Sequence, residues 1–118
     1  MNIQTFSKLI NISSHTIRYY EKIGLIKRIE RNSSGHRYFT SADVLWVEFI
    51  KRLKETGMPL KQILQYAELR DIGPSTSETR MKILEEHALA LEEKIAAEQF
   101  NLQMLKTKIQ HYSNVIKS

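Results

Sequence analysis

The chain has 118 residues, a net charge of +5 and no cysteine. This length accommodates one compact domain of roughly 70 residues and one extended element. The absence of cysteine excludes disulfides, thiolate zinc sites, iron–sulfur clusters and thiol switches. The sequence has no run of about 18 apolar residues and no N-terminal signal segment, so we expect no membrane partner and a cytoplasmic location.

The excess positive charge lies entirely in the first part of the chain. Residues 1–71 hold 12 Lys+Arg and 7 Asp+Glu, whereas residues 72–118 hold six of each. A basic N-terminal part followed by a neutral C-terminal part favours an anionic partner for the former, and nucleic acid is the usual one. From charge alone, a basic surface that only confers solubility is an equally good interpretation.

Two short helices joined by a tight turn are predicted at the N-terminus. The first spans Ile3–Ile10 and places its apolar residues on one face. Asn11 then stands where a sharp turn needs a residue that tolerates positive φ. Ser13 or Ser14 can cap a second helix, which runs through His15–Lys22. This arrangement predicts a helix-turn-helix.

A β-hairpin, or wing, is predicted after the second helix. Two short β-prone stretches, near Leu25–Ile29 and His36–Phe39, flank a turn at residues 32–35 that is rich in Asn, Ser and Gly. Such turn residues between β-prone segments are typical of hairpins. The wing would lie beside the helix-turn-helix.

Two further helices complete the compact part of the prediction. Thr40 and Asp43 resemble a capping box at the start of a helix that stops at Gly57. Pro59 suits the first turn of the following helix. The sequence from Asp71 to Pro74 interrupts the helical pattern again.

Heptad periodicity dominates the end of the chain, where no Gly or Pro occurs from residue 75 to residue 118. The seam positions are Met81, Ala88, Ile95, Leu102, Ile109 and Ile116 at a, and Leu84, Leu91, Glu98, Leu105 and Tyr112 at d. All but the glutamate are apolar, counting the tyrosine, which predicts a coiled-coil seam of about five heptads. A helix of roughly 60 Å is too long for the compact part to cover, so self-association is favoured over packing within the chain.

The second helix carries the candidate base contacts. His15, Arg18 and Lys22 share one face, with Tyr19 beside them, while Ile17 faces inward together with the second tyrosine of the helix. A helix with a cation on its exposed face can enter the major groove, where arginine reads guanine with two hydrogen bonds. Tyrosine hydroxyls commonly bind phosphate oxygens. Any surface helix shows a polar face, but the place of this one after a turn in a basic region favours DNA.

The predicted wing carries its own cations, namely Lys27, Arg28, Arg31, His36 and Arg37. On a hairpin beside a helix-turn-helix these side chains can reach phosphates or the minor groove. The alternative is that they only protect the hairpin edge and keep it soluble. Together with the second helix, they favour a DNA interface.

Nothing in the sequence predicts a metal site or an enzyme. His15, His36, His87 and His111 lack the short spacings of metal ligands, so we expect no bound metal. The sequence contains no nucleophile elbow, no glycine-rich phosphate loop and no paired catalytic carboxylates. We therefore expect no catalysis and no cofactor.

Three motifs resemble one family of bacterial regulators. Residues 16–26, TIRYYEKIGLI, are similar to the signature of the MerR family. Residues 35–39, GHRYF, resemble its wing motif, and residues 56–60, TGMPL, resemble the connector between its third and fourth helices. The long terminal helix is similar to its dimerisation coil, so the resemblance covers the whole chain.

The resemblance implies a mainly α fold, in which a winged helix-turn-helix carries a long C-terminal helix that forms an antiparallel coiled-coil dimer. It implies a regulator that binds a pseudo-palindromic operator on double-stranded DNA and distorts the promoter spacer for RNA polymerase. In a bacterial cell such a regulator would be associated with the nucleoid. The candidate DNA contacts are Ser14, His15, Thr16, Arg18, Tyr19, Lys22, Arg31, His36, Arg37 and Lys54.

The sequence departs from the family pattern at three positions. Asn11 replaces the usual glycine of the turn, and His36 stands where the wing usually has tyrosine. Residues 49–53, FIKRL, are similar to the aldehyde- and thiol-stress branch of the family, but Arg52 occupies the position of its sensing cysteine. Thiol sensing at this position is therefore excluded, and the inducer is unknown.

The heptad pattern also predicts a register for an antiparallel homodimer along residues 77–116. If Leu84 faces Tyr112 of the partner and Leu91 faces Leu105, all apolar seam residues are used. Glu98 then faces its own copy near the two-fold axis. Sliding the helices by one heptad would leave apolar residues unpaired at both ends.

These patterns divide the chain into a DNA-binding domain at 1–71, a linker at 72–76 and a dimerisation helix at 77–118. Two other functions stay open at this stage. One is an architectural or excisionase-like DNA-binding protein without promoter regulation. The other is a coiled-coil interaction protein whose basic N-terminal part has no specific partner.

Overall fold

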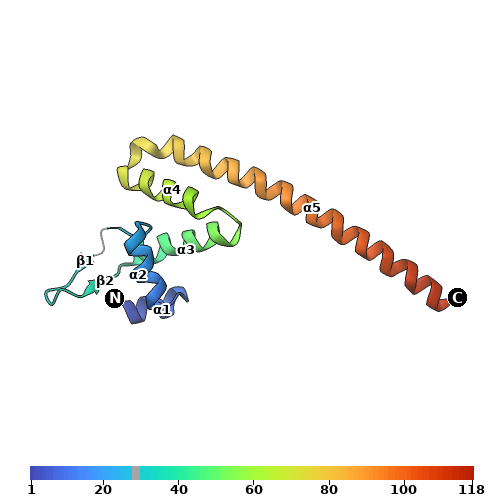
Figure 1. The fold of residues 1–118 in the computed structure, drawn as a ribbon, viewed down its shortest axis with the longest axis horizontal. Helices are drawn as coiled ribbons and strands as arrows, with labels where there is room; N and C mark the ends of the chain where they lie inside the picture. Colours follow the sequence, from blue (N-terminus) through green and yellow to red (C-terminus); the bar gives the residue numbers. More distant parts are fainter. Residues whose placement is uncertain (28–29) are drawn as a thin grey trace. The chain divides into compact units, whose positions relative to one another are not determined.

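A computed structural model describes residues 1–27 and 30–118 of the chain (Figure 1). Arg28 and Ile29 lie outside the described residues, and with them one predicted wing cation. The elements in chain order are α1 (Ile3–Ile10), α2 (Ser14–Ile23), β1 (Glu30–Arg31), β2 (Arg37–Tyr38), α3 (Ser41–Glu55), α4 (Leu60–Ile72), a 3-10 turn η1 (Pro74–Thr76) and α5 (Ser77–Lys117). They form two compact units, the head at 1–81 and the tail at 82–118.

The helix-turn-helix of the head follows from local capping. The Asn2 side chain accepts a hydrogen bond from the Thr5 amide at the start of α1. Asn11 ends α1 with φ of 54°, the left-handed conformation that the turn requires. Ser13 caps α2, because its Oγ accepts from the Thr16 amide at 3.1 Å. The predicted turn is thus confirmed, and the cap is Ser13 rather than its neighbour.

The wing consists of β1, β2 and the turn between them. The strands are antiparallel, with Glu30 opposite Tyr38 and Arg31 opposite Arg37. The side-chain oxygen of Asn32 accepts hydrogen bonds from the amides of residues 34 and 36, which organises the turn.

The prediction of a strand near Leu25–Ile29 was wrong for Leu25–Lys27. The amides of Leu25 and Ile26 both donate to the carbonyl of Tyr20, so this segment completes the C-terminal cap of α2. Leu25 and Ile26 are each only 1% exposed, which explains their apolar character without a strand. Within the described residues, the first strand is β1 at Glu30–Arg31.

The remaining head helices begin at the predicted places. Thr40 and Asp43 form the capping box of α3, with both reciprocal hydrogen bonds present. Pro59 precedes α4 as its N-cap residue, one position before the predicted first turn. Helix α4 continues through Ile72, and the chain leaves it at Gly73.

The head has one apolar core. Residues from α1, α2, α3 and α4 contribute to it, and Phe6, Ile17 and Ile50 have no exposed surface. The Phe6 ring stacks on Phe39, with ring centroids 4.2 Å apart. The indole Nε1 of Trp46 donates to the Leu25 carbonyl at 2.7 Å and so ties α3 to the segment that follows α2. This core fixes the position of the helix-turn-helix.

The tail is a continuous part of α5. Its seam residues expose large apolar side chains, with Leu105 at 63%, Ile109 at 66% and Ile116 at 83% exposed. None of the helices within residues 1–27 and 30–118 has the length and apolar composition needed to cross a membrane. The predicted fold class is confirmed in its mainly helical content, its small hairpin and its long C-terminal helix.

Candidate DNA interface

Helix α2 presents the predicted polar face to solvent. His15, Arg18, Tyr19 and Lys22 are exposed. Ser14 and Thr16 are half-buried at the start of the same helix. The opposite face is buried, because Ile17 is fully covered and Tyr20 is 4% exposed. The helix is therefore anchored on one side and presents cations and hydrogen-bond donors on the other.

Lys54, on α3, contacts Tyr20 on the buried side of α2. Its Nζ donates to the Tyr20 hydroxyl at 2.9 Å and lies 5.2 Å from the centroid of the Tyr20 ring. The side chain predicted as an extra phosphate contact thus also supports α2 from α3. A phosphate contact by Lys54 stays a prediction.

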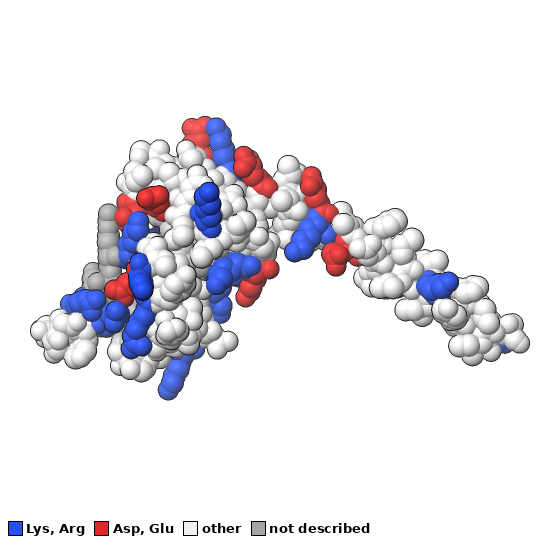
Figure 2. Space-filling view, viewed as in Figure 1, with Lys and Arg blue, Asp and Glu red and all other residues white. Residues whose placement is uncertain are grey.

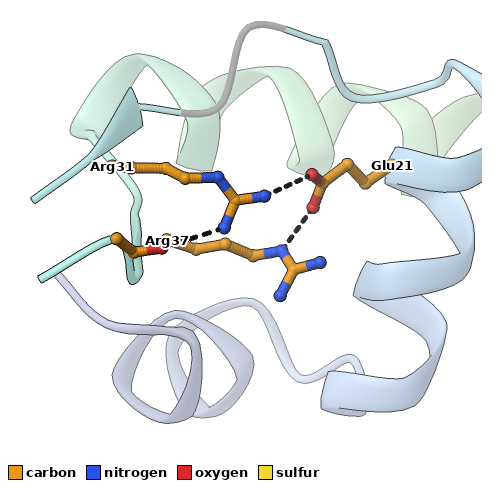
Figure 3. A network of polar contacts seen from close by, with 4 residues as sticks. Glu21, Arg31 and Arg37 are labelled. Atoms are coloured by element: carbon orange, nitrogen blue, oxygen red, sulfur yellow. Dashed lines mark hydrogen bonds and ion pairs between the residues drawn. The ribbon is translucent and has the colours of Figure 1, made fainter.

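Two wing arginines converge on one carboxylate of α2 (Figure 3). The Nε of Arg37 donates to Oε2 of Glu21 at 2.5 Å, and Nη2 of Arg31 approaches Oε1 of Glu21 at 3.4 Å. Arg31 also donates from Nη1 to the Gly35 carbonyl at 3.3 Å. The ion pairs connect both strands of the wing to the helix that carries Arg18.

A cleft of about 570 Å³ lies beside α2, between α1 and the wing. Its lining residues are Asn2, Ile3, Gln4, Arg18, Arg31, Asn32, Gly35, His36, Arg37 and Tyr38. Three arginines and a histidine among them make the cleft suited to an anion such as a backbone phosphate. In Figure 2, Lys and Arg side chains gather over the part of the head that carries α1, α2 and the wing.

Sequence reasoning missed several residues at this surface. Glu21 lies within the quoted family motif, but its two ion pairs span 10 and 16 residues and leave no local pattern. Asn2, the N-cap of α1, and Gln4, in its first turn, line the cleft, while Tyr38 lines it from the wing and is 48% exposed. Amides and a phenol beside arginines are groups that bind DNA phosphates, so their residue types were the available signal.

The tail has a polarised charge distribution. Its acidic residues, Glu85, Glu86, Glu92, Glu93 and Glu98, all lie in the N-terminal half. The second half, from residue 99 onward, contains three lysines and no acidic residue. Figure 2 shows this change from mixed red and blue to blue alone toward the C-terminus. Two such helices attract each other when they run in opposite directions.

Some apolar residues of the tail lie outside the seam. Leu89, Phe100 and Met104 are 59%, 64% and 49% exposed and occupy heptad positions b, f and c. These positions point away from the partner in a two-stranded coil. A second copy that covers the seam therefore leaves them exposed.

The geometry defines a double-stranded DNA-binding protein of the winged helix-turn-helix class, in which a basic wing flanks an exposed helix. Comparison with known families agrees. The family described as MerR HTH family regulatory protein matches residues 1–69, and the one described as MerR, DNA binding matches residues 44–112. The chain belongs to the MerR family, and it is a DNA-binding transcriptional regulator rather than an enzyme.

Two curated relatives illustrate this membership. An uncharacterised HTH-type transcriptional regulator of Haemophilus influenzae is 37% identical over 103 residues, which are 87% of this chain and 76% of that protein. The HTH-type transcriptional regulator AdhR of Bacillus subtilis is 37% identical over 84 residues, or 71% of this chain and 60% of AdhR. Their naming as regulators favours promoter regulation over the architectural alternative.

Two solved structures have the same fold. A putative MerR family regulator from Listeria monocytogenes superposes with a TM-score of 0.89 at 35% identity, covering 96% of this chain and 86% of that one. HiNmlR, described as a MerR family regulator lacking the sensor domain and bound to promoter DNA, gives a TM-score of 0.85 at 34% identity. That match covers 96% of this chain and 90% of HiNmlR.

Proposed function

We propose that the protein binds a pseudo-palindromic operator within a promoter as an antiparallel homodimer and distorts the promoter spacer for RNA polymerase. The observation that carries this proposal is the surface formed by the exposed face of α2 and the basic cleft beside it. Promoter DNA bound to HiNmlR, which shares the fold at 34% identity, supports it. The location that this function requires is the bacterial cytoplasm, on the nucleoid.

Helix α2 enters the major groove. Arg18 lies at the middle of its exposed face and reads a base, with His15 and Lys22 one turn away on either side. Tyr19 reaches the phosphate backbone, because its ring is 47% exposed beside Arg18. Ser14 and Thr16, at the first turn of α2, offer hydroxyl groups to the same backbone.

The wing and its cleft bind the phosphate backbone. Arg31, His36 and Arg37 line the cleft together with Arg18 from α2. Contacts to phosphate supply affinity that does not depend on base sequence. The division of labour is therefore between a helix that selects the operator and a wing that strengthens binding to any duplex.

The pairing of two tails joins the two heads of the dimer. The exposed seam needs an apolar partner, and a second copy offers the same residues in reverse order. The acidic first half and basic second half of each tail then lie beside their opposites. The eleven seam residues from Met81 to Ile116 form the interface in this proposal, with Glu98 near the two-fold axis.

DNase footprinting on the DNA upstream of the chain's own gene tests the proposal. We expect one protected pseudo-palindrome inside a promoter, lost in Arg18→Ala and kept in Glu68→Gln, whose side chain is exposed on α4. Several protected sites outside any promoter would support an architectural protein instead. No protection of any fragment would contradict the proposal.

Spacer distortion needs a second measurement. In transcription with purified polymerase, we expect the protein to change output from the native promoter. The proposal implies a spacer that holds the two promoter elements recognised by polymerase too far apart. Deleting base pairs from this spacer should make the promoter active without the protein, because the two elements then align unaided. Equal dependence on the protein at every spacer length would contradict the distortion.

A further inference from the structure

We propose that Glu21 is the positioning residue of the DNA interface, because it holds Arg31 and Arg37 of the wing in the orientation that binds phosphate. This inference rests on the proposed function. It assigns a role to an acidic side chain on a surface that binds a polyanion, where its own charge opposes binding.

The strand register of the wing brings two arginines together. Arg31 and Arg37 are directly opposite each other on β1 and β2. Like charges at directly opposed positions of an antiparallel pair repel and destabilise it. The carboxylate of Glu21 contacts both guanidinium groups, one with each oxygen (Figure 3). It therefore offsets the repulsion that the pair would otherwise suffer.

The two arginines contact Glu21 through different nitrogens. Arg37 uses its Nε for Glu21, and a guanidinium has five N–H donors in a rigid fork. Four donors on the two Nη groups are left for another anion. Arg31 uses Nη2 for Glu21 and Nη1 for the Gly35 carbonyl, which fixes its plane against the wing turn. Both arginines line the cleft while Glu21 does not.

The ion pair between Glu21 and Arg37 is partly buried. The side chains of Glu21 and Arg37 are 24% and 29% exposed, so their ion pair is partly shielded from solvent. A shielded, charge-assisted contact keeps its geometry better than a fully exposed one. The wing is thereby tied to α2, and the cleft between them exists before DNA arrives. Preformed sites lose less ordering entropy on binding.

The competing interpretation treats Glu21 as a surface charge without a positioning role. The two interpretations predict opposite changes in DNA affinity when the charge of Glu21 is removed. Removing an anion that only repels DNA should tighten binding to every duplex, because the head gains one unit of positive charge. Removing an anion that positions two arginines should weaken binding to the operator, although the net charge becomes more favourable.

The test compares Glu21→Gln with Glu68→Gln, a matched change of charge on the exposed face of α4. Affinities are measured for the operator and for a scrambled duplex over a series of salt concentrations. We expect Glu21→Gln to lose about tenfold in operator affinity, which corresponds to the free-energy contribution of about one charge-assisted hydrogen bond. Glu68→Gln should bind as the wild type or slightly more tightly.

A second background tests whether Glu21 acts through the arginines. In a chain that carries both Arg31→Ala and Arg37→Ala, adding Glu21→Gln should cause no further loss, because the groups it positions are gone. Thermal unfolding of each variant reports whether the head stays folded. Equal or tighter operator binding by Glu21→Gln in the wild-type background would overturn the inference, as would an undiminished loss in the background that lacks Arg31 and Arg37.

The outcome also separates this inference from the proposed function. If the wild type binds no operator, the proposed function fails. If the wild type binds the operator and Glu21→Gln binds it equally well, only the role of Glu21 fails.

Discussion

The head and the tail differ in where their apolar side chains lie. In the head, Phe6 and Ile50 are fully buried among helices of the same unit, whereas in the tail Leu105 and Ile109 are 63% and 66% exposed. The head thus builds an apolar core within one chain, although Leu9, Leu45 and Ile72 on its surface are 58%, 73% and 67% exposed. The tail exposes a continuous apolar seam, which a second copy covers in the proposed dimer. In the proposed function, the first unit supplies specificity for DNA and the second supplies association.

The largest expected effect comes from the seam. Leu105→Lys changes both copies in the dimer, and each lost leucine contact removes about 1.5–3 kcal/mol, giving about 3–6 kcal/mol of dissociation free energy. Sedimentation at micromolar concentration should show monomers. Thr107→Lys, which adds the same charge at an exposed position outside the seam, should remain dimeric. A dimeric Leu105→Lys would place the interface elsewhere.

The head should respond differently to loss of an apolar side chain. Phe6→Ala removes a fully buried ring that stacks on Phe39. We expect the head to lose about 3–5 kcal/mol of unfolding free energy, measured by denaturation. Self-association of the tail should survive at temperatures where the head is unfolded. If the dimer of this variant dissociated before the head unfolded, the stability of the head and the association of the tail would not be independent.

Within the head, α2 and the wing should be separable by mutation. Arg18→Ala should cost about 1–3 kcal/mol of operator binding and relax base preference, because it removes a contact to a base. Arg37→Ala should weaken binding to all duplexes to a similar degree and reduce the dependence of DNA affinity on salt concentration. Both are measured by titration of operator and scrambled DNA. Equal loss of specificity in the two variants would remove the distinction between helix and wing.

The smallest expected effect lies at the centre of the tail. Glu98→Leu should raise the melting temperature of the dimer modestly near neutral pH, since the proposed register brings two carboxylates together. The register itself is tested by Glu98→Cys, which should crosslink to its own copy under oxidation. Ready crosslinking of Leu102→Cys combined with none at position 98 would shift the axis and reject this register.

The sequence predicted those features that depend on neighbouring residues. The turn at Asn11, the cap at Ser13 and the box formed by Thr40 and Asp43 are local, and the structure has all three. The heptads likewise predicted the long helix α5 because periodicity is carried by the chain itself.

Features that depend on distant contacts were missed or misplaced. Leu25 and Ile26 were interpreted as strand residues, because an apolar pair gives no sign that the Trp46 indole and the carbonyl of Tyr20 hold it. The pairing of Glu21 with two wing arginines also had no local signal, since the partners come together only when the wing folds over α2. Most of the candidate interface was predicted, but the way its parts are held together was not.

In the proposed dimer, two paired tails join two heads, and each head binds one half of the operator. This arrangement is tested most directly by titrating wild type and Leu105→Lys on the full pseudo-palindrome and on a single half-site. We predict that the wild type binds the full operator far more tightly than the half-site, because both heads engage at a spacing set by the dimer. Leu105→Lys should bind both DNAs weakly and with similar affinity. Equal preference for the full operator in the two proteins would contradict the account.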